Sequence, residues 1–183
     1  MSSAESDALV IFGITGDLAH KMTFRSLYRL EQRGLLTVPV VGAAVEDWSL
    51  EKLRDRARES ITSAGEELDD AVFARLCGRL RYVPGADQPD FYDRLAQALQ
   101  EFRLPTFYLE IPPSLFGGVI AGLHGKGLLA HGERVVVEKP FGHDLASARA
   151  LDDELHHSID ESQLLRIDHY LGKMGLEEIL YLR

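Results

Sequence analysis

The stretch Ala8-Leu9-Val10-Ile11-Phe12-Gly13-Ile14-Thr15-Gly16-Asp17-Leu18-Ala19 decides the fold of this chain. Five apolar residues in a row predict a buried strand, and a long amphipathic pattern that predicts a helix begins at Leu18. Gly13 permits a tight turn between them, Gly16 lets the backbone approach a ligand, and Ala19 leaves room for close packing of helix on strand. The N-terminus of such a helix offers unpaired N–H groups, which suit a pyrophosphate.

The alternation of strand and helix patterns continues along the chain. Gly34 is a stop signal at the end of the first helix. Strands separated by helices imply parallel crossovers, so we expect an α/β fold: a Rossmann-like, doubly wound parallel sheet with helices on both faces, forming one domain over residues 1–183. Ligands bind such sheets at the carboxyl ends of the strands. The predicted strands are residues 8–12, 38–44, 80–83, 106–111, 134–137 and 164–167, and the predicted helices are 18–33, 50–63, 71–79, 91–103, 114–123 and 145–156.

Composition and charge argue against several classes of protein. A net charge of −9 without a basic patch argues against a nucleic-acid partner. Residues 1–7 lack the pattern of a signal peptide, and no apolar stretch approaches the length of a membrane span. The one cysteine, Cys77, cannot form an internal disulfide, which fits the cytoplasm. His156 and His157 are adjacent, so on a helix they point in different directions, which argues against a metal site.

The glycine turn by itself is weak support for a bound nucleotide, because an ordinary strand-to-helix turn can carry the same glycines. Thr15, His20 and Lys21 are placed to reach phosphate oxygens, and each of them is equally suited to cap the helix or face solvent. The carboxylate of Asp17 would repel a phosphate. It could instead cap the helix by accepting hydrogen bonds from backbone N–H groups.

Two more motifs follow the last two predicted strands. Glu138-Lys139-Pro140-Phe141-Gly142 comes after residues 134–137, and Arg166-Ile167-Asp168-His169-Tyr170-Leu171-Gly172-Lys173 overlaps the end of the last predicted strand, residues 164–167. Ammonium, imidazole and phenol groups at neighbouring strand ends are typical of a site for an anionic ligand. The alternative is a salt-bridged surface loop.

These three signatures, in this order, resemble the N-terminal coenzyme-binding domain of the glucose-6-phosphate dehydrogenase family. The resemblance covers essentially the whole chain and includes the stretch Pro112-Pro113-Ser114-Leu115-Phe116. It implies an NAD(P)-binding Rossmann domain that ends with a substrate-phosphate motif. It also implies an enzyme that passes hydride from C1 of glucose 6-phosphate to NADP, the coenzyme usual in the family, giving 6-phosphogluconolactone in the pentose phosphate pathway.

The resemblance also implies roles for individual residues. Lys139 would lie between coenzyme and substrate and touch both. Asp168 would orient a catalytic histidine, while Arg166 braces the local structure. The sugar phosphate would be held by His169, Tyr170 and Lys173. The residues expected at the coenzyme are Gly13, Ile14, Thr15, Gly16, Asp17, Leu18, Lys21, Glu46, Pro112 and Lys139.

The sequence departs from the family in lacking the second, α+β domain that carries the general base. None of its remaining histidines matches a catalytic position. Loss of a positioned base costs about 10²–10⁴-fold in rate, so we expect these 183 residues alone to have no appreciable activity. Two alternatives remain open: a non-catalytic protein that binds a nucleotide or sugar phosphate, or a regulatory partner of a full-length enzyme. The apolar residues 179–182 favour self-association, as in a homo-oligomer.

The choice of coenzyme is a second departure. Family members that use NADP usually carry a basic residue after the second strand, where this chain has Ala43-Ala44-Val45-Glu46-Asp47. An acidic residue here accepts hydrogen bonds from the free ribose hydroxyls and repels a 2′-phosphate. We therefore expect NAD to be tolerated at least as well as NADP. The alternative is that Glu46 points to solvent and that Lys21 or Arg25 supplies the positive charge.

Overall fold

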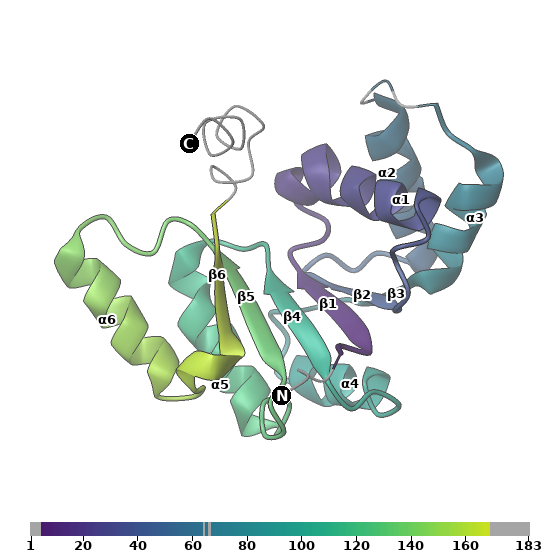
Figure 1. Ribbon diagram of the computed structural model, residues 1–183. Coiled ribbons are helices and arrows are strands. Elements are labelled where there is room, and N and C mark those ends of the chain that lie inside the picture. Colours follow the sequence, from purple (N-terminus) through teal and green to yellow (C-terminus); the bar gives the residue numbers. More distant parts are fainter. Residues whose placement is uncertain (1–4, 64, 66, 169–183) are drawn as a thin grey trace.

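A six-stranded, wholly parallel sheet forms the centre of the computed structural model, which describes residues 5–63, 65 and 67–168 (Figure 1). Its strand order is β3-β2-β1-β4-β5-β6, so the winding reverses between β1 and β4. This confirms the predicted doubly wound sheet and puts a ligand crevice at that reversal. The strands are β1 (Ala8–Phe12), β2 (Val40–Ala43), β3 (Leu80–Val83), β4 (Pro105–Leu109), β5 (Arg134–Glu138) and β6 (Leu164–Ile167).

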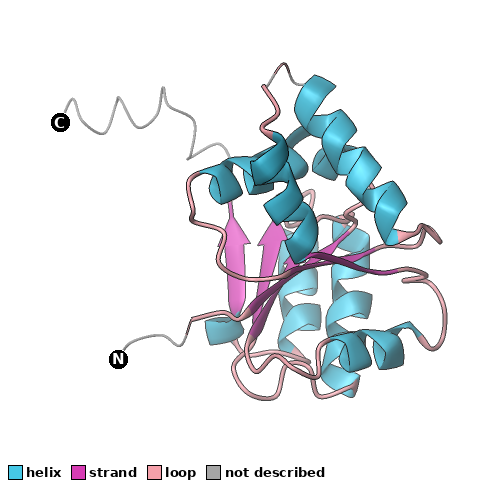
Figure 2. Cartoon of the chain, turned by 90° about the vertical axis from the view of Figure 1, so that its right-hand side faces the viewer, coloured by secondary structure: helices cyan, strands magenta, loops and turns pink. Residues whose placement is uncertain are grey.

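Helices cover both faces of the sheet, as Figure 2 shows. One apolar cluster joins one face of β1–β3 to the first three α-helices, and a second joins the opposite face of β1–β6 to the last three. Alternate residues of the same strand serve the two clusters: Val10 packs into one and Ile11 into the other. The α-helices are α1 (Phe24–Gln32), α2 (Leu50–Ser63), α3 (Asp70–Arg79), α4 (Phe91–Ala98), α5 (Phe116–Gly125) and α6 (Leu145–His156).

Several predicted elements differ from the structure at their ends. The helix predicted over residues 91–103 ends at Ala98, and the strand predicted over residues 106–111 runs from Pro105 to Leu109. The first helix contains a π-helical segment, η1 (Ala19–Thr23), and is α-helical from Phe24; Gly34, with φ of +68°, ends it as predicted. β2 begins at Val40 because Pro39 has no N–H for the ladder. The helix expected over residues 114–123 is a 3₁₀ turn, η2 (Pro113–Leu115), followed by α5. A further 3₁₀ turn is η3 (Glu161–Gln163).

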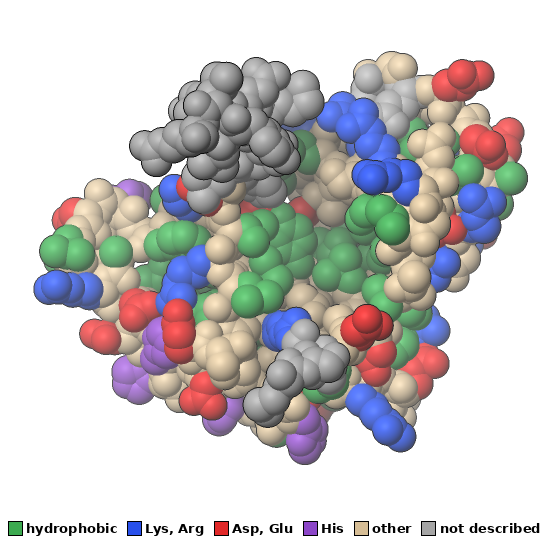
Figure 3. All heavy atoms as spheres, in the orientation of Figure 1, with side chains coloured by type: hydrophobic (Ala, Val, Ile, Leu, Met, Phe, Trp, Pro, Cys, Tyr) green, Lys and Arg blue, Asp and Glu red, His purple; other side chains and the backbone are tan. Residues whose placement is uncertain are grey.

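One part of the sheet is covered on a single face. In the described chain, α1–α3 lie over β1–β3, and no helix lies over the same face of β5 and β6 (Figure 1). A groove of about 390 Å³ runs there, beside α1, and apolar side chains gather along it (Figure 3). Its lining includes Tyr108 of β4, Val136 of β5 and Ile167 of β6. This open face reaches the carboxyl ends of β5 and β6, where the two charged motifs that contain Lys139 and Asp168 begin.

Candidate functional site

The glycine turn after β1 has the tight geometry that the sequence predicts. Gly13 has a φ of +81°, and a Cβ built on it would lie only 2.2 Å from the backbone oxygen of Glu110. Its N–H donates to the carbonyl of Ala43 at 2.8 Å, and the N–H of Gly16 donates back to Gly13 at 2.9 Å. The turn is therefore wedged between the ends of β2 and β4, and only glycine fits its first position.

A cavity of about 560 Å³ opens beside this turn, where the strand order reverses. The turn supplies one wall, the loop after β2 another, and the segment after β4 a third. Most of the lining is apolar, with a few polar groups at its edge, and its size suits a cofactor-sized ligand. Of the residues predicted to bind coenzyme, the structure brings together here Gly13, Thr15, Gly16, Glu46 and Pro112. We call this cavity the nucleotide groove.

The other coenzyme-binding residues predicted in the glycine motif lie outside the nucleotide groove. Ile14 is fully buried in the core beneath the turn. Leu18 lines the groove on the open sheet face instead. Lys21 is exposed on η1, and neither it nor His20 is among the described lining residues of either groove. The interpretation of Asp17 as a helix cap is wrong: the N-cap position is Leu18, and no side chain caps this helix.

Glu46 is held at the rim of the nucleotide groove by two hydrogen bonds. The hydroxyl of Thr15 donates to its carboxylate at 2.5 Å, and the hydroxyl of Tyr82 donates to its backbone carbonyl at 2.6 Å. Burial raises the pKa of Tyr82 well above its usual value, and the carboxylates of Glu46 and Asp47 raise it further, so Tyr82 stays protonated as a donor. Glu46 is exposed at this rim, so its carboxylate meets both the Thr15 hydroxyl and solvent.

Positive charge is lacking along this groove. None of its described lining residues is lysine or arginine, and Arg25, like Lys21, is not among them. The sequence had shown the missing basic residue after β2. It had not shown two tyrosines as part of the site: Tyr92 of α4, which lines the groove, and Tyr82 of β3, which fixes Glu46. Each comes from an ordinary amphipathic pattern, and only the tertiary fold reveals its neighbours.

The edge formed by β5 and β6 brings the other two motifs together. Lys139 Nζ lies 2.5 Å from Asp168 Oδ2, with the lysine side chain 59% exposed and the aspartate 21% exposed. Lys139 is not among the lining residues of the nucleotide groove. Nearby, Tyr108 donates a hydrogen bond to Glu138, and Thr23 donates one to Glu110. The predicted phosphate-holding residues His169, Tyr170 and Lys173 lie outside the described residues, as does the apolar run 179–182.

A membrane role has no support from the helices. Within the described residues, none combines the length and the apolar character needed to cross a bilayer.

The chain is similar to known proteins over nearly its full length. The family described as "Glucose-6-phosphate dehydrogenase, NAD binding domain" matches residues 10–177. Glucose-6-phosphate 1-dehydrogenase 1 of Mycobacterium tuberculosis (strain ATCC 25618 / H37Rv) is 52% identical over 179 residues, which make up 97% of this chain and 38% of that protein. Glucose-6-phosphate 1-dehydrogenase of Bacillus subtilis (strain 168) is 37% identical and is covered to 37% of its length. The chain thus spans less than half of these relatives.

Solved structures agree with the sequence matches. The X-ray structure of glucose-6-phosphate 1-dehydrogenase from Mycobacterium avium superimposes with a TM-score of 0.90 at 54% identity, covering 98% of this chain and 40% of that one. A structure of glucose-6-phosphate dehydrogenase in complex with its substrate glucose-6-phosphate superimposes with a TM-score of 0.88 at 34% identity. The match covers 99% of this chain and 40% of that one. These matches confirm the resemblance that the three sequence signatures indicated.

Proposed function

The chain belongs to the glucose-6-phosphate dehydrogenase family through its NAD-binding domain, and from this premise we propose that it is the coenzyme-binding half of such an enzyme. The enzyme would pass hydride from C1 of glucose 6-phosphate to a nicotinamide coenzyme, giving 6-phosphogluconolactone. The observation that carries the proposal is the nucleotide groove, which opens beside the glycine turn at the reversal of strand order. We assign the protein to the cytoplasm, where a single cysteine stays reduced.

The residues around the groove fit a dinucleotide. A side chain at Gly16 would fill the cradle beside the turn, since its Cβ would lie 3.1 Å from the carbonyl of Gly13. The N–H groups at the start of η1 would hold the pyrophosphate, with Thr15 beside them. Pro112, on the wall after β4, would contact the nicotinamide end. When bound, the coenzyme supplies the hydride acceptor; the protein's part is to hold it in place and exclude water.

We propose that NAD binds at least as well as NADP. The Glu46 carboxylate, fixed by Thr15, is placed to accept hydrogen bonds from free ribose hydroxyls. A 2′-phosphate at the same position would face that carboxylate in a groove whose described lining has no cation to balance it.

The substrate would bind at the edge of β5 and β6. Lys139 would contact the substrate and the reacting end of the coenzyme, and His169, Tyr170 and Lys173 would hold the phosphate. Asp168, 21% exposed and paired with Lys139, would orient the histidine base and stabilise its protonated form.

Calorimetric titration with NAD tests the proposal. We expect saturable one-to-one binding by the native chain and none by Gly16→Val, whose side chain fills the cradle. Gly125→Ala is the matched control, because a Cβ there meets nothing within 4 Å and lies outside the groove; its affinity should equal that of the native chain. Equal binding by Gly16→Val, or no binding by the native chain, would reject the assignment.

A further inference from the structure

β6 is an edge strand, and the residue proposed to orient the base follows directly after it. Among the described strands β6 pairs only with β5, with Arg166 opposite Val137 and Ile167 opposite Glu138. A four-residue ladder on one side gives limited restraint to the position of Asp168. Side-chain contacts from β6 to its neighbours therefore add to what holds Asp168 against Lys139.

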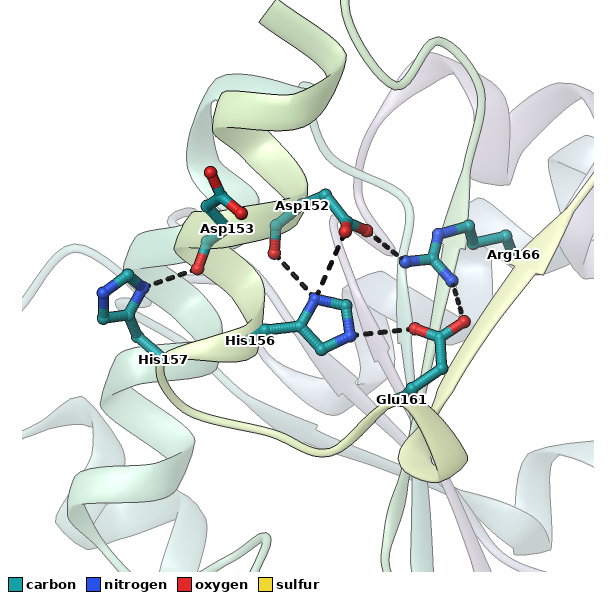
Figure 4. Close-up of polar contacts among 6 residues, drawn as sticks. All are labelled: Asp152, Asp153, His156, His157, Glu161 and Arg166. Atoms are coloured by element: carbon teal, nitrogen blue, oxygen red, sulfur yellow. Dashed lines mark hydrogen bonds and ion pairs between the residues drawn. The ribbon is translucent and has the colours of Figure 1, made fainter.

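Arg166 makes those contacts, as Figure 4 shows. Its guanidinium donates to Asp152 Oδ1 of α6 at 2.5 Å and to Glu161 Oε1 of η3 at 2.7 Å. His156 of α6 closes the circle, with Nε2 2.9 Å from the Glu161 carboxylate and Nδ1 2.8 Å from the carbonyl of Asp152. We call these four side chains the α6–β6 clamp. It joins three elements through charge-assisted hydrogen bonds, the strong kind.

The clamp is balanced in charge when His156 is protonated. Both ring nitrogens of His156 face acceptors, and only the imidazolium can donate from both. The hydrogen bond to the Asp152 carbonyl, then Glu161, raises the pKa of His156. Hydrogen bonds from Arg166 and His156 lower the pKa of Glu161. The neighbouring His157 points away, to the carbonyl of Asp153 (Figure 4).

Three residues of the clamp could also suggest a metal site, but the negative charge of their carboxylates is already balanced. Donor atoms of Asp152, His156 and Glu161 lie within 4.8 Å of one another, and all three side chains are exposed. Arg166 bonds to both carboxylates and supplies the positive charge that an ion would bring. The arrangement connects α6, η3 and β6 through ion pairs and is not a vacant cation site.

We propose that Arg166 is a positioning residue that sets Asp168 against Lys139 through the α6–β6 clamp; this rests on the function proposed above. Both members of the pair are tied to α6. Lys139 is the first residue of the segment that leads to Asp144, the N-cap of α6. Asp168 lies two residues after Arg166, which donates a hydrogen bond to Asp152 in the third turn of α6. Helix α6 is rigid, and it connects the segment that carries Lys139 to the residues that bind Arg166. The clamp therefore fixes the end of β6 relative to α6.

Zero-length cross-linking measures this position directly. A carbodiimide joins a lysine amine to a carboxylate only when they touch, and mass spectrometry of the digested chain then quantifies the Lys139–Asp168 link. The Lys126–Asp93 pair, on other elements, serves as the internal standard in every sample. In the native chain both links should form. In Arg166→Gln the ratio of the first to the second should fall roughly tenfold, which corresponds to about 1.4 kcal/mol.

The matched control is Arg56→Gln, which removes an arginine–glutamate contact within α2 and should leave the ratio unchanged. Circular dichroism checks that Arg166→Gln is folded; if it fails to fold, Glu161→Gln replaces it and should lower the ratio in the same direction. An unchanged ratio in a folded clamp variant overturns the proposal. Failure of the native chain to bind NAD would reject the proposed function and leave the cross-link result intact.

The pH dependence distinguishes positioning from simple stability. The clamp is complete below the ordinary pKa of histidine and weakens as the pH rises through the raised pKa of His156. The cross-link ratio of the native chain should therefore fall as the pH rises through that range, and that of His156→Gln should not. Parallel profiles for the two chains would contradict the role of the clamp.

Discussion

Two regions lie along the carboxyl ends of the strands, and they differ in whether backbone or side chains form them. Around β1, β2 and β4, the nucleotide groove is shaped by the backbone: a glycine turn wedged between strand ends, with apolar walls. Around β5 and β6, the site consists of long charged side chains, of which Lys139 and Asp168 are paired. Backbone geometry shapes the nucleotide groove, and side chains enter only at its rim, where Thr15 and Tyr82 hold Glu46. The proposed substrate half would depend on its neighbours, which are the α6–β6 clamp on one side and an open sheet face on the other.

Among these predictions, replacing Gly13 should have the largest effect on stability and on NAD affinity. In Gly13→Ala the new Cβ meets the Glu110 carbonyl at 2.2 Å in a backbone conformation that alanine rarely adopts. We expect a loss of about 3 kcal/mol in the free energy of unfolding, and NAD affinity reduced by more than about a hundredfold. Thermal unfolding and calorimetry give the two values. The control Gly78→Ala, in an open position on α3, should be neutral or slightly stabilising.

A charge reversal at the rim of the groove should change the coenzyme preference. Glu46→Arg removes the carboxylate that faces the 2′-position and supplies a guanidinium that can pair with a phosphate. We expect the ratio of NADP to NAD affinity to rise by roughly tenfold to a hundredfold. Glu51→Arg makes the same change of charge on α2, outside the groove lining, and should leave the ratio nearly unchanged. Equal shifts in the two variants would mean that net charge, and not the position of Glu46, sets the preference.

Loss of one support for Glu46 should have a smaller effect. Tyr82→Phe removes the hydroxyl that donates to the Glu46 carbonyl at 2.6 Å and keeps the ring. A neutral hydrogen bond contributes about 1 kcal/mol, so NAD affinity should fall less than about tenfold. Tyr28→Phe, which loses a hydroxyl bonded to the backbone of residues 67 and 69, is the control and should affect stability alone. A larger loss of affinity in Tyr28→Phe would contradict this account.

The smallest effect should come from the helix cap beside the substrate half. Asp144 accepts the N–H of Ser147 at 2.8 Å, and this hydrogen bond lowers the pKa of Asp144. Because the folded pKa is the lower one, the cap contributes stability above the ordinary pKa of aspartate, and that contribution is lost as the pH falls through the folded pKa. Asp144→Asn should therefore slightly reduce the dependence of the melting temperature on acid pH. NAD affinity should be unchanged, since Asp144 is outside the groove lining.

The sequence predicted the backbone-built half better than the side-chain half. The glycine turn, all six strands and the Gly34 stop were readable because periodicity and glycine positions are local signals. The mistaken cap at Asp17 arose because Asp17 is itself already helical, and the helix then becomes a π-helix at Ala19, which no local pattern announces. The tyrosine support of Glu46 joins a strand to a loop that lies 36 positions away in the chain. The clamp around Arg166 spans only 14 positions, but it joins a helix to a strand, and only the tertiary fold decides how the two lie together.

Titration of these 183 residues with NAD and NADP under identical salt conditions tests the central claim most directly. The account predicts that NAD binds in the nucleotide groove with an affinity equal to or higher than that of NADP, because Glu46 accepts from ribose hydroxyls and no described lining residue pairs with a 2′-phosphate. Failure to bind either coenzyme would contradict the groove assignment. NADP binding more than about tenfold tighter, a difference of about 1.4 kcal/mol, would contradict the role given to Glu46.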